Sequence, residues 1–381
     1  MTPESSVGRR DLVTRVLDGV ASLGRTGVAT AARLDGVRAT GAPYAWRRFR
    51  HDSSLVAALR AHRTRLYRRI WAEAAQALDA TITDLPGEFV QIRANGRVTL
   101  VRQHSTTLDG EVAVELGTVK AAGYRLLSAH GLPVPEHVEL NSSDPAPAVE
   151  FIRTAPPPFI VKPAVGGAGF GVTGNVETVS DLRRAMLRAS LFTPRVIVER
   201  QHPGSVYRLL LLDGELIDTI CRSPPHVTGD GQSSIGELAF AECCRRVEKQ
   251  GMGGLLPLWV DLDAVLTLRR EGLRSSSVLP QNVRIPLKVA TNQNAAHENV
   301  TINSVSPDLV AEAARAAAAV GLRLAGVDVV TSDATTSLVA SGGVVLEVNR
   351  PALHHHYLVA DPDHATRVAV PVLARALGLS S

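Results

Sequence analysis

The stretch PPPFIVKPAVGGAGFGVTG, residues 156–174, places a lysine on a short apolar run directly before a glycine-rich segment. The chain contains only four lysines, Lys120, Lys162, Lys249 and Lys288, among 41 Lys+Arg, so arginine supplies nearly all other positive charge. Glycine allows backbone N–H groups to approach phosphate oxygens, and lysine is a compact point charge on a slim stem. We therefore predict that Lys162 faces a phosphate under a glycine-rich flap.

Three common phosphate-binding templates do not fit this segment. Gly169-Phe-Gly171-Val-Thr-Gly174 matches GxGxxG, but a dinucleotide-binding loop opens a helix, whereas VTGNV has the pattern of a returning strand. A kinase loop needs a lysine shortly downstream, and the next one is Lys249. None of the four lysines directly follows a glycine, as a Walker A loop requires. The remaining interpretation is a β-hairpin that lies over a triphosphate.

Acidic residues inside apolar strands suggest the second half of such a site. Asp328 lies in AGVDVV, and Glu347 and Asn349 lie in VVLEVNR. Lone carboxylates are costly to bury, and residues two apart on a strand share a face. Carboxylate and amide oxygens are the ligands that Mg²⁺ prefers when it bridges ATP phosphates. We predict that these three residues bind Mg²⁺; the alternative is a buried ion pair.

Composition indicates an ordinary soluble protein. The 381 residues are 45% hydrophobic and 20% charged, enough for two or three structural units. The N-terminus lacks an uninterrupted apolar segment, and no run approaches the length needed to span a bilayer, so we predict a cytoplasmic protein without a membrane partner. Cys221, Cys243 and Cys244 lack CxxC spacing and are expected to be reduced thiols.

Positive charge is concentrated in residues 44–70, which carry eight arginines, several of them on a predicted amphipathic helix from Ser53 to Ala80. We favour a solvated face, or a face that pairs with acidic residues in a homo-oligomer, over RNA binding. The chain shows neither zinc-finger spacing nor an RNP-like aromatic motif, so we do not expect a nucleic-acid partner.

The pattern of elements predicts an α+β fold. Residues 1–84 have a mostly helical pattern, and a hairpin follows around the Asn-Gly turn of QIRANGRVTLVRQ. Another hairpin is expected to turn at Asp213-Gly214, and a helix is expected between Ser306 as N-cap and Gly321 as its stop. Hairpins mixed with helices favour antiparallel sheet layers over a regular βαβ repeat.

These segments together resemble the ATP-grasp superfamily, and within it the ligase part of cyanophycin synthetase and of the bifunctional glutathione synthetases. The resemblance runs from about Glu88 to Tyr357 through LGTVKAAGYRLLSAHGLPVP, PFIVKPAVGGAGFGV, RVIVERQHPGSVYRLLLLDGELI, CRSPPHVTGDGQSSIGEL, GVDVV and LEVN, in that order. It implies an ATP-grasp fold over residues 85–381, with a flap subdomain over about 120–198, a catalytic subdomain over 199–381, and the helical region 1–84 as an extension.

The resemblance also implies roles for individual residues. Lys120, Lys162 and the flap residues Gly167, Ala168 and Gly169 would contact ATP phosphates. Backbone groups near Ile197 to Arg200 would hold the adenine, Glu199 or a neighbour would hold the ribose, and Arg208 matches an arginine of that block. Asp328, Glu347 and Asn349 match the magnesium ligands. Arg222 would orient the substrate carboxylate, Arg350 would add a second clamp, and Lys288 and Asn294 would lie near the acyl phosphate.

Three departures from the family pattern bear on the substrate. KVATNQNAAHEN (288–299) replaces the usual asparagine and paired glycines, and Arg350-Pro351-Ala352-Leu353 precedes three histidines where small residues and Pro-Gly are usual. No Mur-ligase-like domain follows, so cyanophycin synthesis itself is not expected. Consecutive side chains point in different directions, so His354, His355 and His356 cannot easily share one ion; we expect one of them to line the substrate pocket.

We therefore predict an ATP-dependent carboxylate–amine ligase that acts through an acyl phosphate, with small carboxylate and amine substrates such as amino acids or peptides in secondary metabolism. A glutathione-type or cyanophycin-type ligase is the alternative within this class. A kinase-like phosphotransferase, a non-catalytic nucleotide-binding module and an Arg-rich partner-binding protein are the alternatives outside it.

Overall fold

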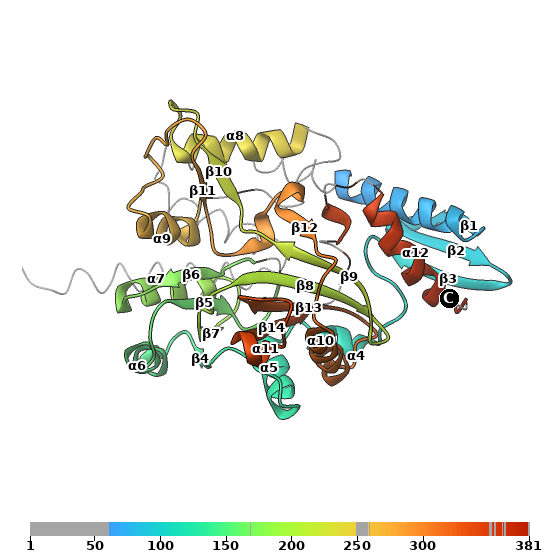
Figure 1. Ribbon diagram of the computed structural model, residues 1–381, viewed down its shortest axis with the longest axis horizontal. Helices are drawn as coiled ribbons and strands as arrows, with labels where there is room; N and C mark the ends of the chain where they lie inside the picture. The colour runs from blue at the N-terminus through green and yellow to red at the C-terminus, as the bar shows by residue number, and fades with distance from the viewer. Residues whose placement is uncertain are drawn as a thin grey trace, which may run out of the picture.

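The computed structural model describes residues 61–167, 169–248, 258, 260–349, 353, 356–359, 361 and 363–379. These residues form a three-stranded sheet, a four-stranded sheet in the order β4-β7-β5-β6, and a five-stranded sheet in the order β12-β9-β8-β13-β14. Every pairing within these sheets is antiparallel. Helices cover the sheets (Figure 1), which confirms the predicted α+β class.

The four-stranded sheet carries the segment that contains Lys162. It comprises β4 (His137–Asn141), β5 (Phe159–Pro163), β6 (Thr173–Val176) and β7 (Arg195–Arg200), with β5 and β6 forming the expected hairpin. Phe159 and Val161 alternate with Lys162 on β5, and they pack with α6 (Ala146–Thr154) and α7 (Val179–Ser190) in one apolar cluster. Because side chains alternate along a strand, Lys162 points from the opposite face of the sheet.

The five-stranded sheet comprises β8 (Ser205–Leu212), β9 (Glu215–Arg222), β12 (Asn299–Thr301), β13 (Leu324–Thr331) and β14 (Val344–Asn349). One face packs on α5 (Lys120–Ala129) and α10 (Pro307–Val320) through residues such as Leu209, Leu211 and Val327. The other face carries Arg208 and Asp328 on adjacent strands. This second face is therefore polar at the end that holds those residues.

Three local signals read from the sequence, one pair of helix caps and two hairpin turns, are confirmed. The Ser306 hydroxyl accepts hydrogen bonds from the N–H groups of Asp308 and Leu309 at the start of α10, and Gly321 ends this helix with a φ of 79°. Asp213 and Gly214 join β8 to β9 as the turn of the predicted hairpin. The hairpin predicted around Asn-Gly is formed by β2 (Phe89–Ala94) and β3 (Arg97–Arg102).

A third unit packs on the face of the five-stranded sheet that carries Arg208 and Asp328. It lies at the other end of that face, where Leu210 and Leu212 of β8 are buried. It joins the helix over 61–77, β1 (Thr81–Leu85), β2, β3 and α12 (His364–Ala376), which Figure 1 shows side by side. Trp71 and Tyr67 are buried in it and contact the cluster that includes Leu210 and Leu212 of β8. The chain thus returns at its C-terminal helix to the element formed by its first described residues.

Residues 44–60 of the arginine-rich segment lie outside the described residues, so the predicted start of the helix at Ser53 is not tested. The helix ends at residue 77, three residues before the predicted end at Ala80. Arg68 pairs with Asp84 of β1 (Nε to Oδ1, 2.5 Å), and Arg69 lies 3.7 Å from Glu73. These two arginines therefore have acidic neighbours within the chain.

The remaining elements connect these units. They are η1 (Pro86–Glu88), α4 (Glu111–Leu116), β10 (His226–Thr228), α8 (Ile235–Glu248), α9 (Leu262–Arg270), β11 (Arg284–Pro286), η2 (Thr291–Gln293), η3 (Ala296–Glu298), α11 (Leu338–Ser341) and η4 (His356–Leu358). Within the described ranges, no helix has both the length and the apolar character that a bilayer span requires. The division into subdomains stays a prediction.

Candidate active site

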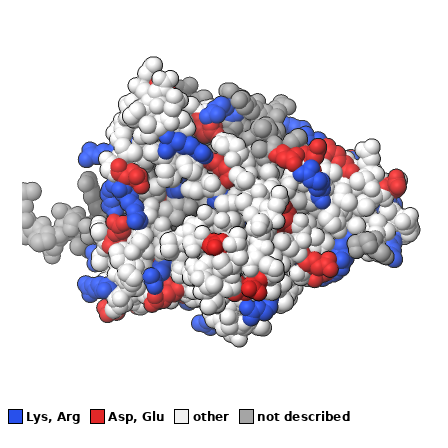
Figure 2. All heavy atoms as spheres, viewed as in Figure 1, with Lys and Arg blue, Asp and Glu red and all other residues white. Residues whose placement is uncertain are grey.

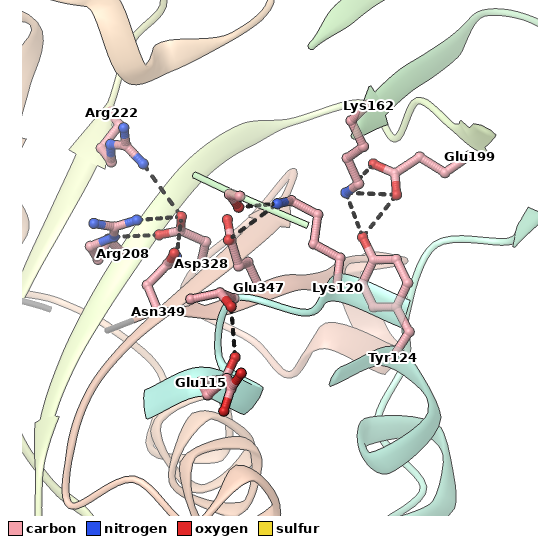
Figure 3. Close-up of polar contacts among 12 residues, drawn as sticks. Glu115, Lys120, Tyr124, Lys162, Glu199, Arg208, Arg222, Asp328, Glu347 and Asn349 are labelled. Carbon is pink, nitrogen blue, oxygen red and sulfur yellow. Dashed lines mark hydrogen bonds and ion pairs between the residues drawn. The ribbon is translucent and has the colours of Figure 1, made fainter. Parts of the chain in front are cut away.

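A cavity of about 570 Å³ lies between the four-stranded and five-stranded sheets. Its walls include Lys162 and Glu199 from the first sheet and Asp328 and Glu347 from the second. Figure 3 shows the two groups facing one another with Lys120 between them. The structure thus brings together residues that are up to 227 positions apart along the chain, counted from Lys120 to Glu347.

Lys162 is held by a buried triangle of polar groups. Its Nζ donates to Glu199 Oε1 and to the Tyr124 hydroxyl, each at 2.8 Å, and the same hydroxyl donates to Glu199 Oε2 at 2.8 Å. Lys162 is 6% exposed and Glu199 1% exposed, so this ion pair is shielded from solvent. Burial, followed by the charge of Glu199, raises the pKa of Tyr124, which keeps the hydroxyl protonated as a donor.

Lys120 opens α5 and reaches across the cavity. Its Nζ donates to the backbone carbonyl of Gly166 in the flap at 2.5 Å and lies 3.9 Å from Glu347 Oε1. Burial lowers the pKa of Lys120, while the charge of Glu347 opposes this shift. Lys120 therefore links the flap to strand β14.

A β-bulge directs Glu347 into the cavity. Val345 of β14 lies opposite Val329 and packs on the face covered by α10. In a regular strand Glu347 would share the face of Val345. The ladder instead pairs Glu347 with Asp328, leaving Leu346 as the extra residue, so Glu347 moves to the face of Asp328.

Asp328 is the centre of a dense hydrogen-bond network. Arg208 donates from Nε to Oδ1 and from Nη2 to Oδ2, both at 2.6 Å, in a bidentate pair. Asn349 donates its Nδ2 to Oδ2 at 3.0 Å, and Arg222 approaches Oδ2 at 3.4 Å. Burial alone would raise the pKa of Asp328, but the Arg208 charge and hydrogen bonds hold that pKa below its ordinary value.

Arg222 occupies an unusual electrostatic position. It is 2% exposed, lines the cavity and donates from Nη2 to Asn292 Oδ1 at 2.7 Å. Burial, followed by the nearby charge of Arg208, lowers the pKa of Arg222 to about 9. An anion in the cavity would therefore relieve two buried arginine charges that share a single carboxylate.

Two flap glycines lie at the cavity wall, and one of them, Gly169, leaves no room for a side chain. Gly167 and Gly169 line the cavity. Gly169 has a φ of +68°, and a Cβ on it would lie 2.8 Å from Nδ2 of Asn292. Ala168 lies outside the described residues.

Of the two residues predicted for the site in segment 288–299, Lys288 lines the cavity and Asn294 does not. Lys288 lines the cavity, but its Nζ donates to Asp261 Oδ2 at 2.6 Å and to Gln293 Oε1 at 2.7 Å, and burial lowers its pKa. Asn294 does not line the cavity; its Nδ2 donates to the carbonyl of Ser223 and to Asn299 Oδ1. The neighbouring Asn292, which sequence reasoning missed, lies at the cavity instead.

Other predicted residues are distributed as follows. Arg200 lines the cavity and lies 3.7 Å from Glu136. Arg350, His354 and His355 lie outside the described residues. His356 is fully buried and does not line this cavity, so it is not the pocket histidine that the sequence led us to expect.

The donor set fits a magnesium ion. Asp328 and Glu347 are cross-strand neighbours that both line the cavity. Asn349 does not line it, and it donates its amide nitrogen to Asp328, which leaves its amide oxygen as a further hard ligand. The facing lysines and flap glycines fit the phosphates of a nucleotide.

Comparison with known proteins finds ligases and synthetases among the chains that resemble this one. A family profile described as the D-ala D-ala ligase C-terminus matches residues 126–217. Cyanophycin synthetase from Trichormus variabilis is 31% identical over 255 residues, which cover 65% of this chain and 28% of that protein. The bifunctional glutathione biosynthesis protein GshAB from Streptococcus mutans is 26% identical over 287 residues, covering 72% of this chain and 37% of that protein.

Residues 126–217 therefore match a ligase family, and over about two thirds of its length the chain is similar to the ATP-grasp ligases named above. It spans about a third of the length of these two relatives. Among solved structures, a bifunctional glutathione synthetase from Pasteurella multocida is similar with a TM-score of 0.48 at 20% identity, covering 79% of this chain and 43% of that one. The D-alanine–D-alanine ligase from Bacillus anthracis has a TM-score of 0.44 at 13% identity, covering 70% and 69%.

The surface of this chain carries mixed charge on the face seen in Figure 2, where basic and acidic side chains are interspersed. Neither positive nor negative charge dominates among the described residues on that face. A nucleic-acid-binding surface would show clustered positive charge, so this face gives no support to RNA binding.

Proposed function

We propose that this chain is a carboxylate–amine ligase that uses Mg·ATP to convert a carboxylate into an acyl phosphate, which an amine then attacks to form an amide, ADP and phosphate. The observation that carries the proposal is the cavity in which Lys120 and Lys162 face Asp328 and Glu347, with Arg222 beside them. The donor and acceptor that we propose are an amino acid or small peptide of secondary metabolism.

Each group would act by charge and position. Asp328, Glu347 and Asn349 would hold Mg²⁺, which would neutralise negative charge on the ATP phosphates. Lys120 and Lys162 would bind phosphate oxygens beneath the flap. The buried triangle around Lys162 fixes its ammonium in place, so little reorganisation is needed when a nucleotide binds.

Arg222 would orient the acid that is to be activated. Its guanidinium is fixed by Asn292 and lies next to Asp328, so an anionic group bound there lies near the proposed metal site. A substrate carboxylate is repelled by a phosphoryl group, and a buried arginine offsets that repulsion while aligning the two reactants. Asn292 therefore joins the site as a residue that positions Arg222.

The proposal is tested by incubating the purified protein with Mg·ATP, pools of carboxylic and amino acids, and hydroxylamine as a surrogate amine. We expect ADP release together with a hydroxamate, and splitting the pools identifies the donor. ADP formed with a stable phosphorylated product, and without hydroxamate, would instead support a phosphotransferase. Binding of Mg·ATP without turnover in any pool would support a nucleotide-binding module.

A further inference from the structure

A second group of buried polar side chains lies outside the cavity. It comprises Asp218 of β9, His356 of η4 and His364, the first residue of α12. Asp218 is 9% exposed, His356 is fully buried and His364 is 6% exposed. None of them lines the cavity, so the proposed ligase chemistry gives them no role.

The three side chains converge on one point. Asp218 Oδ2 lies 2.5 Å from His356 Nδ1 and 2.8 Å from His364 Nε2, and one ligand atom from each residue lies within 4.8 Å of the others. His356 Nε2 is buried without a hydrogen-bond partner among the described residues. Two imidazoles thus compete for a single carboxylate oxygen.

A second β-bulge places the carboxylate there. Leu216 of β9 lies opposite Leu211 and packs toward α10, so a regular strand would turn Asp218 to that same apolar face. The ladder instead pairs Asp218 with Leu210, leaving Ile217 as the extra residue. This irregularity brings Asp218 to the face on which the two histidines lie.

Two imidazole nitrogens and a carboxylate oxygen form a donor set that Zn²⁺ and related ions bind in proteins. Burial lowers the pKa of His356, which favours the neutral imidazole that coordinates metals. We propose that Asp218, His356 and His364 bind one transition-metal ion of the zinc class. The ion would fasten η4 to strand β9 and helix α12.

The observed N–O distances are those of hydrogen bonds, as expected when protons occupy the place of the ion. Bonds of about 2.0–2.2 Å to a central ion require the ligand atoms to separate slightly. On binding, the ion takes the place of the shared protons, and a neutral imidazole keeps its proton on its other ring nitrogen, which in His356 is the unpaired Nε2. The adjacent His354 and His355 are not part of the proposed site.

The test uses untagged full-length protein that has been dialysed against a chelator. We expect Co²⁺ titration to give visible absorption bands that saturate at one ion per chain and are bleached by Zn²⁺. We also expect saturating Zn²⁺ to raise Tm by about 5 °C, since a ligand that binds the folded state stabilises it. Asp218→Asn and His364→Gln should abolish both effects.

His226→Gln is the matched control, because His226 also lies 3.3 Å from a buried carboxylate, Glu298, but is not part of the three-residue group. This variant should bind Co²⁺ as the wild type does. Equal binding by the Asp218 and His364 variants, or no binding by the wild type, would overturn the proposal. X-ray absorption of the Zn²⁺-loaded wild type adds a test that does not depend on variant folding. Two imidazoles and oxygen in the first shell are expected, and sulfur there would contradict the assignment.

Discussion

The role of Lys162 could be predicted from the sequence, but the side chains that hold it could not. Its scarcity among arginines and its place before the flap predicted a phosphate-facing lysine. The structure adds that Tyr124 and Glu199 fix its ammonium. Glu199 was expected at the ribose on the strength of the resemblance, and no local pattern signalled its buried pairing with Lys162.

Replacing Lys162 with arginine tests the argument from shape. The guanidinium is larger and planar, and the triangle around Nζ leaves it little space, so we expect kcat/KM for ATP to fall about 100-fold or more. Arg195→Lys on β7, where an exposed arginine pairs with Glu139, is the control and should change little. Unchanged kinetics in Lys162→Arg would show that any cation suffices.

Glu347→Gln tests the assignment of the metal ligand. The amide retains the size of the side chain but removes the charge that attracts Mg²⁺, so we expect ADP formation to fall at least about 100-fold with the fold intact by circular dichroism. Glu115→Gln, an exposed carboxylate near the start of α5, should retain activity. Wild-type turnover in Glu347→Gln would remove Glu347 from the metal site.

At the scale of elements, strands and helices with strong periodicity were predictable, and irregularities were not. The hairpins of β2–β3 and β8–β9 and the caps of α10 followed from turn and capping residues. The bulge residues Leu346 and Ile217 are ordinary apolar residues, so nothing in the sequence marks them. Those bulges nevertheless decide which face Glu347 and Asp218 occupy.

Asp263 of α9 connects the flap hairpin to the 288–299 segment. Its Oδ1 accepts from the N–H of Gly174 in β6, and its Oδ2 accepts from the N–H groups of Val289 and Ala290. Asp263→Ala would leave these donors unpaired in a buried region. We expect the free energy of unfolding in urea to fall by about 2–3 kcal/mol. Glu150→Ala, at an exposed position of α6, is the control and should change it by less than about 0.5 kcal/mol. An equally small change in Asp263→Ala would show that the three hydrogen bonds accepted by Asp263 add no stability.

At the scale of the whole molecule, the N-terminal and C-terminal parts of the described chain form one apolar cluster with the five-stranded sheet. Tyr67 and Trp71 pack with Val372 of α12 and Leu210 of β8. Helical character in this region was predictable, but its docking was not, because an apolar stripe does not specify its partner. The resemblance also covered none of the first 80 residues.

Trp71→Ala tests whether this packing supports the whole fold. Trp71 is 1% exposed, and its indole Nε1 donates to the carbonyl of Gln103 at 2.5 Å. We expect the free energy of unfolding to fall by about 3–5 kcal/mol, while ATP affinity at low temperature stays unchanged. Val112→Ala, at an 81% exposed position, is the control. A small loss of stability in Trp71→Ala would show that the unit docks only weakly.

The most direct measurement is calorimetric titration of ATP into the full chain with and without Mg²⁺, because it requires no knowledge of the substrates. The account predicts one ATP per chain, with affinity that depends on Mg²⁺ and falls at least about tenfold in Glu347→Gln but not in Glu115→Gln. Absence of ATP binding, or binding that neither Mg²⁺ nor Glu347→Gln alters, would contradict the proposed Mg·ATP site.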